Sequence, residues 1–280
     1  MSERLSQAAL VVETAGRRWL VDAARAIDLS IPLRFDGPQP SAFGADAARE
    51  QALEAGSFVG DVRRGGSCNC NSYSLTPHCN GTHTECVGHI THERISVRDI
   101  AVDHLVAALL LSVTPEASEA TAESSIPAPQ SGDRLITRKA LQQAASAHSG
   151  SVFGALVIRT LPNDKDKLSR DYGIADIPPY FSVDAMRWIV ECNVRHLVVD
   201  LPSLDRGADE GHLTTHRLFW GMPPGGKSFA TATRANATVT ELAYVDAAVA
   251  DGFYLLNLQV APFDADAAPS RPILYPAVPA

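Results

Sequence analysis

The chain has 280 residues, of which 45% are hydrophobic and 20% charged, which is the composition of a globular protein with a sizeable core and excludes a disordered or fibrous chain. Its formal net charge of −8 repels nucleic acid and anionic membrane surfaces, so we expect neither as a partner. The N-terminus lacks the charged-then-apolar order of a secretory signal, and the longest apolar run, near residues 105–113, is about half a membrane span, so we expect a cytoplasmic protein.

The first quarter of the chain contains four predicted elements. Residues 1–26 have the mixed polarity of a helix, and the alternating IDLSIPLRF at 27–35 is typical of a strand. Residues 45–56 are rich in helix formers and end in Gly, which predicts a short helix with a glycine cap. The pattern over 67–76 alternates small apolar and polar residues, which predicts a strand leading into a histidine-rich loop.

The middle of the chain alternates apolar runs and helical patterns. Residues 97–113 contain an apolar stretch that suits either a helix or a strand. Thr114–Gly132 breaks all periodicity and is rich in Ser, Ala, Pro and Glu, so we expect an exposed insertion at 114–132. Residues 137–147 form a helical pattern, and VFGALVIRT at 152–160 is typical of a buried strand.

The order of elements after residue 180 indicates the fold class. Residues 182–193 begin with a Ser cap and are amphipathic, which predicts a helix, and RHLVVDLP at 195–202 is a buried strand. Strand, helix and strand in this order predict α/β architecture with some parallel pairing. A last strand is predicted within 251–263, and the absence of internal repeats favours a single domain spanning 1–280.

Residues 78–89 collect groups that bind metals in the pattern H-x-x-G-T-H-x-E-x-x-x-H. Asn80-Gly81-Thr82 supplies a turn, and His83 and Glu85, two residues apart, project to the same face of an extended chain. His78 lies across the turn from them. Imidazoles and carboxylates held around one point are what a divalent ion needs, so this loop predicts a metal site. Histidines without a common ligand are the alternative, which the clustering disfavours.

Two other segments carry candidate functional groups. Asp200, Ser203 and Asp205 follow a predicted strand, where α/β enzymes place functional side chains, although ordinary turn and cap chemistry explains the same residues. His212 and His216 are four residues apart, the spacing that puts both on one helix face.

These motifs resemble the putative cyclase family, which includes bacterial kynurenine formamidase and isatin hydrolase and has the signature H-x-G-T-H-x-D-x-x-x-H. The resemblance extends from about residue 27 to the end of the chain, with GFYLLNLQVAPFDADAAPSRPIL as its last segment. Besides the histidine loop, the similar segments are IDLSIPL at 27–33, GSFVGD at 56–61, ALVIRT at 155–160 and RHLVVDLPSLDR at 195–206.

The resemblance implies a fold and an activity. The fold would be a single α/β domain with a mixed sheet or barrel-like core flanked by helices, the swivelling fold of the cyclase family. The activity would be that of an arylformamidase-like, metal-dependent hydrolase that cleaves a C–N amide bond, in a formamide or a cyclic amide, by attack of a metal-activated water. A small-molecule substrate, one or two divalent metals per chain (zinc or manganese) and a homo-oligomer are implied as well.

The resemblance also implies roles for individual residues. One extra residue precedes Gly81, so Cys79 stands at the family's spacing and competes with His78 as a ligand, and Glu85 replaces the family's Asp. Trp220, which follows the ligand loop, would wall the substrate pocket. The first metal would be held by His78, His83 and Glu85. Glu85 would bridge to a second metal, which Glu241 and either His216 or its rival His212 would also hold. His89 would be the acid/base residue.

Two alternatives to the amide hydrolase are compatible with the same residues. The chain could be a non-catalytic member that binds a metal or a ligand without activating water. It could also be a dehydrating cyclase, which would use the same site and differ only in its product.

Overall fold

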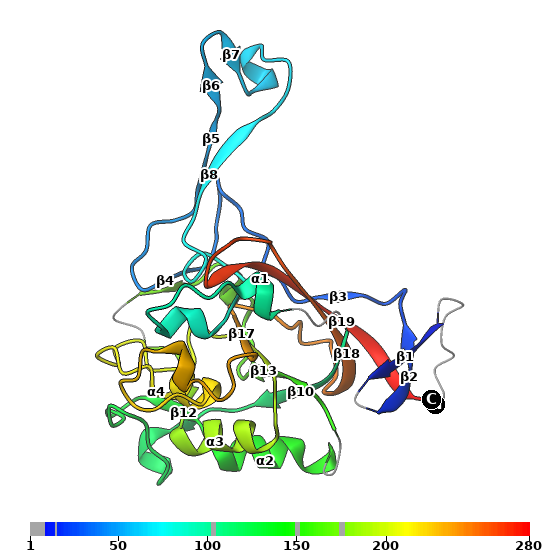
Figure 1. Cartoon of the computed structure of the whole chain (residues 1–280), viewed down its shortest axis with the longest axis vertical. Coiled ribbons are helices and arrows are strands. Elements are labelled where there is room, and N and C mark those ends of the chain that lie inside the picture. Colours follow the sequence, from blue (N-terminus) through cyan, green and yellow to red (C-terminus); the bar gives the residue numbers. More distant parts are fainter. Residues whose placement is uncertain (1–8, 15, 102–104, 149–151, 174–176) are drawn as a thin grey trace.

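Seven strands form a closed, barrel-like mixed sheet in the computed structural model (Figure 1). The structure describes residues 9–14, 16–101, 105–148, 152–173 and 177–280. β9 pairs with both β17 and β19, and this double pairing closes the ring. In order around the barrel the strands are β19 (Ala267–Pro279), β18 (Gly252–Val260), β10 (Val106–Val113), β13 (Ala155–Thr160), β16 (His196–Val199), β17 (Thr238–Glu241) and β9 (His83–Glu85).

The four neighbouring strands β10, β13, β16 and β17 run parallel and are almost continuously apolar or buried. Parallel strands have such continuous apolar sequences when both faces of the sheet are covered. On β10, Leu109 and Leu111 belong to the core shared with the helices, whereas Ala108 and Leu110 pack on the other face with Leu256 of β18. The buried strand predicted at 152–160 and the strand predicted at 195–202 are therefore confirmed, as β13 and β16.

Helices α2 (Arg138–Ala145) and α3 (Val183–Glu191) lie side by side against one face of the barrel (Figure 1). The hydroxyl of Thr137 accepts a hydrogen bond from the backbone N–H of Ala140, and Ser182 does the same for Ala185. These are N-cap contacts, which satisfy backbone donors left free in the first turn. The helices predicted at 137–147 and 182–193 are confirmed. The two other α-helices are α1 (Val97–Ile100) and α4 (Thr214–Trp220).

The helix predicted over residues 1–26 is wrong for the residues that the structure describes; its residues 1–8 and 15 lie outside them. Instead β1 (Ala9–Thr14) and β2 (Arg17–Asp22) form an antiparallel hairpin. β2 continues the sheet because it pairs with the C-terminal end of β19, and its Trp19 and Val21 are buried on one face. The hairpin is thus joined to the sheet by long-range pairing of β2 with β19, which local helix propensity does not report.

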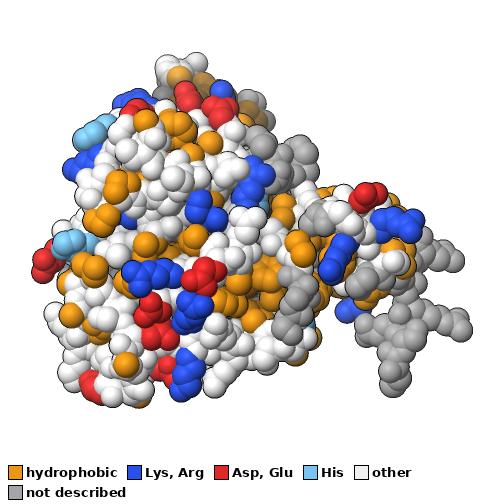
Figure 2. Space-filling model, turned by 60° about the horizontal axis from the view of Figure 1, so that its bottom comes forward, with side chains coloured by type: hydrophobic (Ala, Val, Ile, Leu, Met, Phe, Trp, Pro, Cys, Tyr) orange, Lys and Arg blue, Asp and Glu red, His pale blue; other side chains and the backbone are white. Residues whose placement is uncertain are grey.

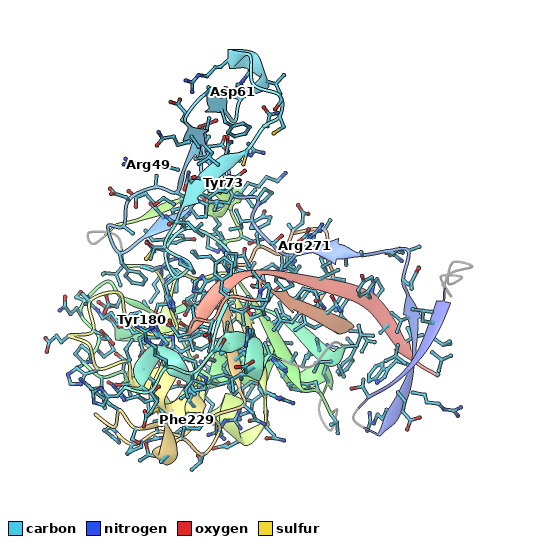
Figure 3. The ribbon with its side chains drawn as sticks, turned by 45° about the horizontal axis from the view of Figure 1, so that its top comes forward. Arg49, Asp61, Tyr73, Tyr180, Phe229 and Arg271 are labelled. Atoms are coloured by element: carbon cyan, nitrogen blue, oxygen red, sulfur yellow. The ribbon has the colours of Figure 1, made fainter. Side chains whose placement is uncertain are left out.

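The helix predicted over 45–56 is also wrong, because this segment is one side of an arm that stands away from the barrel (Figure 1). Gly56 has a φ of 60°, which suits the turn at the end of the arm. Asp61 lies near the tip, and Arg49 and Tyr73 lie closer to the barrel (Figure 3). The arm pairs β5 (Arg49–Ala52) with β8 (Asn71–Ser74), the part of the strand predicted at 67–76 that forms, and β6 (Glu54–Ala55) with β7 (Phe58–Val59).

The apolar segment predicted at 97–113 divides into α1 and β10, and its residues 102–104 lie outside the described residues. The strand predicted at 251–263 is β18. Short strands and 3-10 helices complete the described chain, which contains no helix long and apolar enough to cross a bilayer. They are β3 (Ile27–Asp28), β4 (Ser41–Ala42), β11 (Glu116–Ala117), β12 (Arg134–Ile136), β14 (Asp171–Tyr172), β15 (Tyr180–Phe181), η1 (Val62–Arg64), η2 (Val87–Ile90), η3 (Ser118–Ala120), η4 (Ser146–His148), η5 (Lys165–Leu168) and η6 (Phe229–Thr231).

Residues 114–132, where we expect an insertion, contain β11 and η3 and are fastened to the helices by Glu123. The Glu123 carboxylate accepts hydrogen bonds from the backbone N–H groups of Arg138 and Lys139, at 2.8 and 3.2 Å, and from the hydroxyl of Ser182. A carboxylate at a helix N-terminus satisfies free donors and complements the helix dipole. Glu123 therefore joins the first turns of α2 and α3 through one side chain.

Charged side chains of both signs are interspersed on the face that Figure 2 shows. No continuous basic track runs across the described part of this face.

Asp133 anchors the loop that follows β16. Its carboxylate accepts hydrogen bonds from Tyr180 Oη at 2.7 Å, from Arg206 Nε at 2.8 Å and from the backbone N–H of Gln130 at 2.9 Å. The side chains of Asp133, Tyr180 and Arg206 are all buried. Burial alone would raise the pKa of Asp133, but the hydrogen bonds from Arg206, Gln130 and Tyr180 outweigh it and lower the pKa below 3.8. The buried Arg206 guanidinium depends on this carboxylate.

We predict that Asp133→Ala lowers the free energy of unfolding by about 3 kcal/mol, because it leaves the Arg206 charge buried and unpaired. Urea denaturation at pH 7 measures this. Asp46→Ala is the control, since its side chain is 93% exposed and pairs with Arg49 only at 3.9 Å, and it should cost under about 0.5 kcal/mol. Because folding lowers the pKa of Asp133, the loss of unfolding free energy in Asp133→Ala should be largest above pH 3.8 and should shrink as the pH falls below that value. Equal losses in both variants would contradict the prediction.

Candidate metal centre

Strand β9 carries the centre of the candidate site. Its two outer residues, His83 and Glu85, are completely buried and lie two positions apart, so both project to the same face, as the sequence predicts. Pairing in register places Glu241 of β17 opposite His83 and Ala267 of β19 opposite Glu85. The preceding turn is pinned by Thr82, whose hydroxyl donates to the carbonyl of Leu242 and accepts from the backbone N–H of Ile31.

The carboxylate of Glu85 lies between two sets of nitrogen donors. Its Oε1 is 3.1 Å from His216 Nε2, and its Oε2 is 3.0 Å from His78 Nδ1 and 3.8 Å from His89 Nδ1. Ligand atoms that lie within 4.8 Å of one another form two buried or half-buried groups that share Glu85. These groups are His78, His83 and Glu85, and Glu85, His216 and Glu241.

Four buried polar atoms of this cluster have no hydrogen-bond partner among the described residues. They are both oxygens of Glu85, Nε2 of His83 and Nε2 of His216. His78 Nδ1 and Glu85 Oε2 are close, but they are not aligned as donor and acceptor. Leaving a buried carboxylate and imidazole nitrogens unsatisfied costs several kcal/mol in total. A divalent cation would satisfy all four, and imidazole nitrogens with carboxylate oxygens are ligands that zinc and manganese accept, so the donor set fits the metal.

Two of the imidazoles are held by hydrogen bonds through their other ring nitrogen. His83 Nδ1–H donates to the carbonyl of Gly81 at 2.9 Å, and His216 Nδ1–H donates to Asp205 at 2.7 Å. Because both partners are acceptors, Nδ1 carries a proton in each ring, so the neutral imidazole has its lone pair on Nε2, which is the tautomer a metal requires. Asp205 is itself fixed by the backbone N–H groups of Thr215 and His216, at 2.8 and 3.2 Å.

The charges of the cluster depend on one another. Burial would raise the pKa of Glu85, but the positive charges of His89, His216 and His78 outweigh it and lower the pKa well below 4.5. Burial would lower the pKa of His216, but the carboxylates around it, Asp205 first, raise it well above 6.5. For His78, burial is likewise outweighed by Asp266 and Glu85, which raise its pKa to about 10. The site therefore presents carboxylates in their charged form, as metal ligands must be.

The structure brings together the residues that the sequence singles out: His78, His83, Glu85, His89, His216 and Glu241. Glu241 ends β17, and its Oε1 accepts a hydrogen bond from the backbone N–H of Leu204 at 3.1 Å.

Three other residues that the sequence singles out lie outside the candidate ligand groups. Cys79 is buried nearby but belongs to none of the ligand groups found among the described residues. His212 is exposed and precedes α4, which begins at Thr214, so it does not share a helix face with His216. Trp220 is fully buried; its ring centroid lies 5.5 Å from that of His216, and its indole N–H donates to Ala237. It packs against His216, and the pocket wall expected of it stays a prediction.

Asp200 and Asp205, which both follow β16, have different roles: Asp200 pairs with Lys167, whereas Asp205 belongs to the site. Asp200 accepts from the buried Lys167 Nζ at 2.8 Å and from Thr160, so its interactions are satisfied within the fold. Asp205 instead orients His216. The sequence marks the segment but does not distinguish the two carboxylates, since both follow the same strand.

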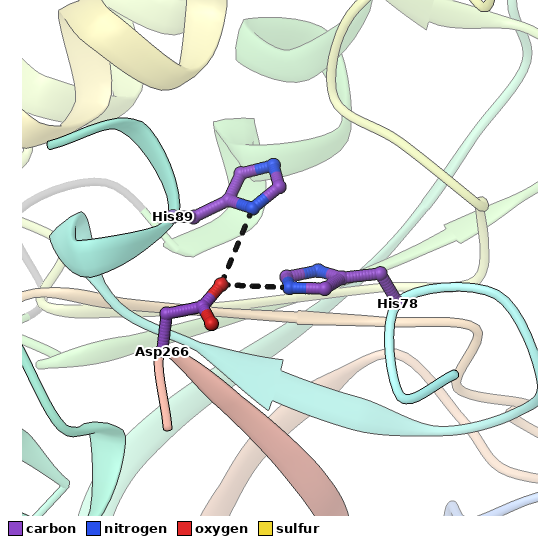
Figure 4. Close-up of side chains that lie close together, drawn as sticks. All are labelled: His78, His89 and Asp266. Atoms are coloured by element: carbon purple, nitrogen blue, oxygen red, sulfur yellow. Dashed lines mark hydrogen bonds and ion pairs between the residues drawn. The ribbon is translucent and has the colours of Figure 1, made fainter. Parts of the chain in front are cut away.

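Asp266 is the site residue that sequence reasoning missed. Its Oδ2 lies 2.8 Å from His78 Nε2 and 3.5 Å from His89 Nδ1 (Figure 4). The only sequence signal is an acidic residue directly before the last strand, and nothing local links that strand to the histidine loop. Pairing of β19 with β9 brings them together.

Comparisons with known proteins show that the fold is shared with solved structures. Isatin hydrolase A from Labrenzia aggregata, bound to benzyl benzoate, has a similar fold with a TM-score of 0.59, 17% identity, and coverage of 90% of this chain and 93% of that one. A predicted metal-dependent hydrolase from Bacillus stearothermophilus aligns with a TM-score of 0.54, 17% identity, and coverage of 90% and 98%. Isatin hydrolase A from Ralstonia solanacearum aligns with a TM-score of 0.57, 16% identity, and coverage of 90% and 91%.

These identities establish a shared fold: a single α/β domain built on a closed mixed sheet. No curated protein sequence matches the chain significantly. The family model described as "Putative cyclase" matches residues 27–206, which is well over half of the chain. With its histidine loop inside that match and its fold shared with these structures, the chain belongs to the putative cyclase family.

Proposed function

We propose that the protein is a metal-dependent hydrolase that cleaves a C–N amide bond in a formamide or a cyclic amide. The observation that carries the proposal is Glu85, a completely buried carboxylate whose two oxygens face separate imidazole groups and have no hydrogen-bond partner in the part of the chain that the structure describes. Support comes also from structures of similar fold that are isatin hydrolases, one of them bound to the product analogue thioisatinate.

The donor set has room for one or two divalent ions, zinc or manganese. His78, His83 and Glu85 would hold the first, and Glu85, His216 and Glu241 the second. When bound, such an ion supplies a Lewis acid that polarises a carbonyl group and makes water acidic near neutral pH. The protein's own part is to fix the orientation of these side chains, which Gly81, Asp205 and Leu204 do through hydrogen bonds to His83, His216 and Glu241.

His89 is the candidate for proton transfer. Its side chain is 28% exposed, so it lies where the buried cluster opens to solvent, and its Nδ1 faces the carboxylates of Glu85 and Asp266. The opposite nitrogen, Nε2, is then free to take a proton from the attacking water and to give it to the leaving amine nitrogen. An imidazole in this position is the usual general acid and base near neutral pH.

The first prediction concerns the metal. Protein purified without an affinity tag should contain a divalent metal by elemental analysis, and Glu85→Gln should lose most of it, because the neutral amide removes the shared negative charge. Cys79→Ser is the matched control and should keep the metal, since His78 and not Cys79 belongs to a candidate ligand group. Metal lost in Cys79→Ser and kept in His78→Ala would reverse that assignment.

The second prediction concerns the orientation of His216. Asp205→Asn should weaken metal binding roughly 10- to 100-fold, because an amide can turn its N–H toward the ring and favour the wrong tautomer. Competition with a chromophoric chelator measures the affinity. Asp209→Asn lies on the same loop and accepts only backbone N–H groups, so it should bind metal like wild type. Identical affinities for both variants would refute the role of Asp205.

The third prediction concerns catalysis. His89→Ala should lower the turnover of N-formyl aryl amines and isatin-like cyclic amides roughly 10²- to 10⁴-fold while retaining the metal, because it removes the proton carrier. His212→Ala, which is exposed and outside the cluster, should turn over normally.

Other results would point to the alternatives. Full activity after complete metal removal would exclude the proposal. Bound metal without turnover across amides and lactones would favour a non-catalytic binding protein, and a product formed by loss of water would favour a dehydrating cyclase.

A further inference from the structure

We propose that Asp266 is a positioning residue that holds His78 and His89 together and fixes the ring nitrogen that each presents to the site. The inference rests on the proposed function, in which His78 is a ligand and His89 carries the proton. It adds a residue outside the histidine loop, and it explains how one loop supplies a ligand and a proton carrier whose rings are only 4.3 Å apart between centroids.

The backbone of Asp266 is fixed by the closure of the barrel. Asp266 directly precedes β19, whose first residues pair with β9, and its carbonyl accepts a hydrogen bond from the backbone N–H of Cys86 at 3.0 Å. Its Cα is therefore held beside the strand that carries Glu85. The side chain is 40% exposed and points to the open side of the cluster, where His78 and His89 are 24% and 28% exposed.

The turn that carries His89 is packed closely against this position. A Cβ atom at Gly88 would lie 2.4 Å from the carbonyl oxygen of Ile95 and 3.2 Å from Cβ of Asp266. Only glycine permits that approach without a shift of the backbone. η2 therefore packs closely against Asp266, and this packing limits the positions available to the imidazole of His89.

The contacts of the Asp266 carboxylate determine the tautomers of His78 and His89. A carboxylate only accepts hydrogen bonds, so the nitrogens facing it, Nε2 of His78 at 2.8 Å and Nδ1 of His89 at 3.5 Å, carry their protons. With a metal ion bound between them, His78 would then present the lone pair of Nδ1 to the ion that it shares with Glu85, whose Oε2 lies 3.0 Å away. His89 presents Nε2 for proton transfer. One carboxylate thereby assigns different nitrogens to different tasks in two neighbouring rings (Figure 4).

The same three residues also have ligand atoms within 4.8 Å of one another, so a separate metal ion is the competing explanation. An ion bound there would require lone pairs, not protons, on the nitrogens that face Asp266. The two explanations therefore predict opposite tautomers and different metal counts.

The experiment compares wild type, Asp266→Asn and Asp266→Glu as zinc-loaded full chains with ¹⁵N-labelled histidine. Long-range ¹H–¹⁵N spectra should show His89 protonated at Nδ1 in wild type and redistributed toward Nε2 in Asp266→Asn, because the amide can present a donor. The kcat for the best substrate should fall roughly 10- to 100-fold with KM changed less than about threefold, and Asp266→Glu should recover part of the loss. Asp264→Asn, an exposed neighbour, should match wild type in every measurement.

The outcomes separate this inference from the proposed function. Unchanged tautomers in both Asp266 variants, or the loss of one metal equivalent in Asp266→Asn, would overturn the positioning role. If wild type turns over no substrate, the spectra still decide: a shifted His89 tautomer supports the positioning role while the proposed function fails. Should Asp266→Asn not fold by circular dichroism, Asp266→Glu provides the same spectral test, with a displaced carboxylate expected to perturb His89.

Discussion

The burial of the Glu85 carboxylate is the constraint around which the rest of the structure is arranged. A charged group with no access to water and no hydrogen-bond partner is stable only if positive charge surrounds it. Three elements supply that charge: the loop before β9 brings His78, η2 brings His89 and α4 brings His216. The same arrangement that makes the buried carboxylate tolerable is the arrangement that grips a divalent ion, so folding and metal binding use one set of contacts.

Closure of the barrel is what brings these elements into reach. β9 is only three residues long, yet it pairs with β17 on one side and β19 on the other. The first pairing delivers Glu241 beside His83, and the second delivers Asp266 beside the rim. Each partner strand comes from the last fifth of the chain. A short strand therefore carries little stability of its own, but its two registers set the geometry of the site, because a slip by one residue would turn Glu241 away from the cluster.

The sequence predicts the features that are encoded locally. The helix at 182–193 follows from a Ser cap and an amphipathic pattern, and the histidine loop follows from ligands that lie close together in the chain. The helix expected at 1–26 forms strands instead because its partner, the end of β19, lies at the other end of the sequence. Asp266 was missed for the same reason. His216 and Glu241 were found through resemblance to a family, which carries long-range information that propensity and periodicity lack.

The distribution of exposure divides the cluster into a rigid inner part and an accessible outer part. His83, His216 and Glu241 are buried, and each is held by a hydrogen bond from within the fold. His78 and His89 are partly exposed and are held from outside by a single carboxylate. A substrate reaching the cluster must approach from this outer side, since the inner ligands are sealed by the barrel and α4. The buried residues are then suited to metal binding. His89, the partly exposed imidazole outside the two proposed ligand groups, is suited to exchange protons with a substrate and with water.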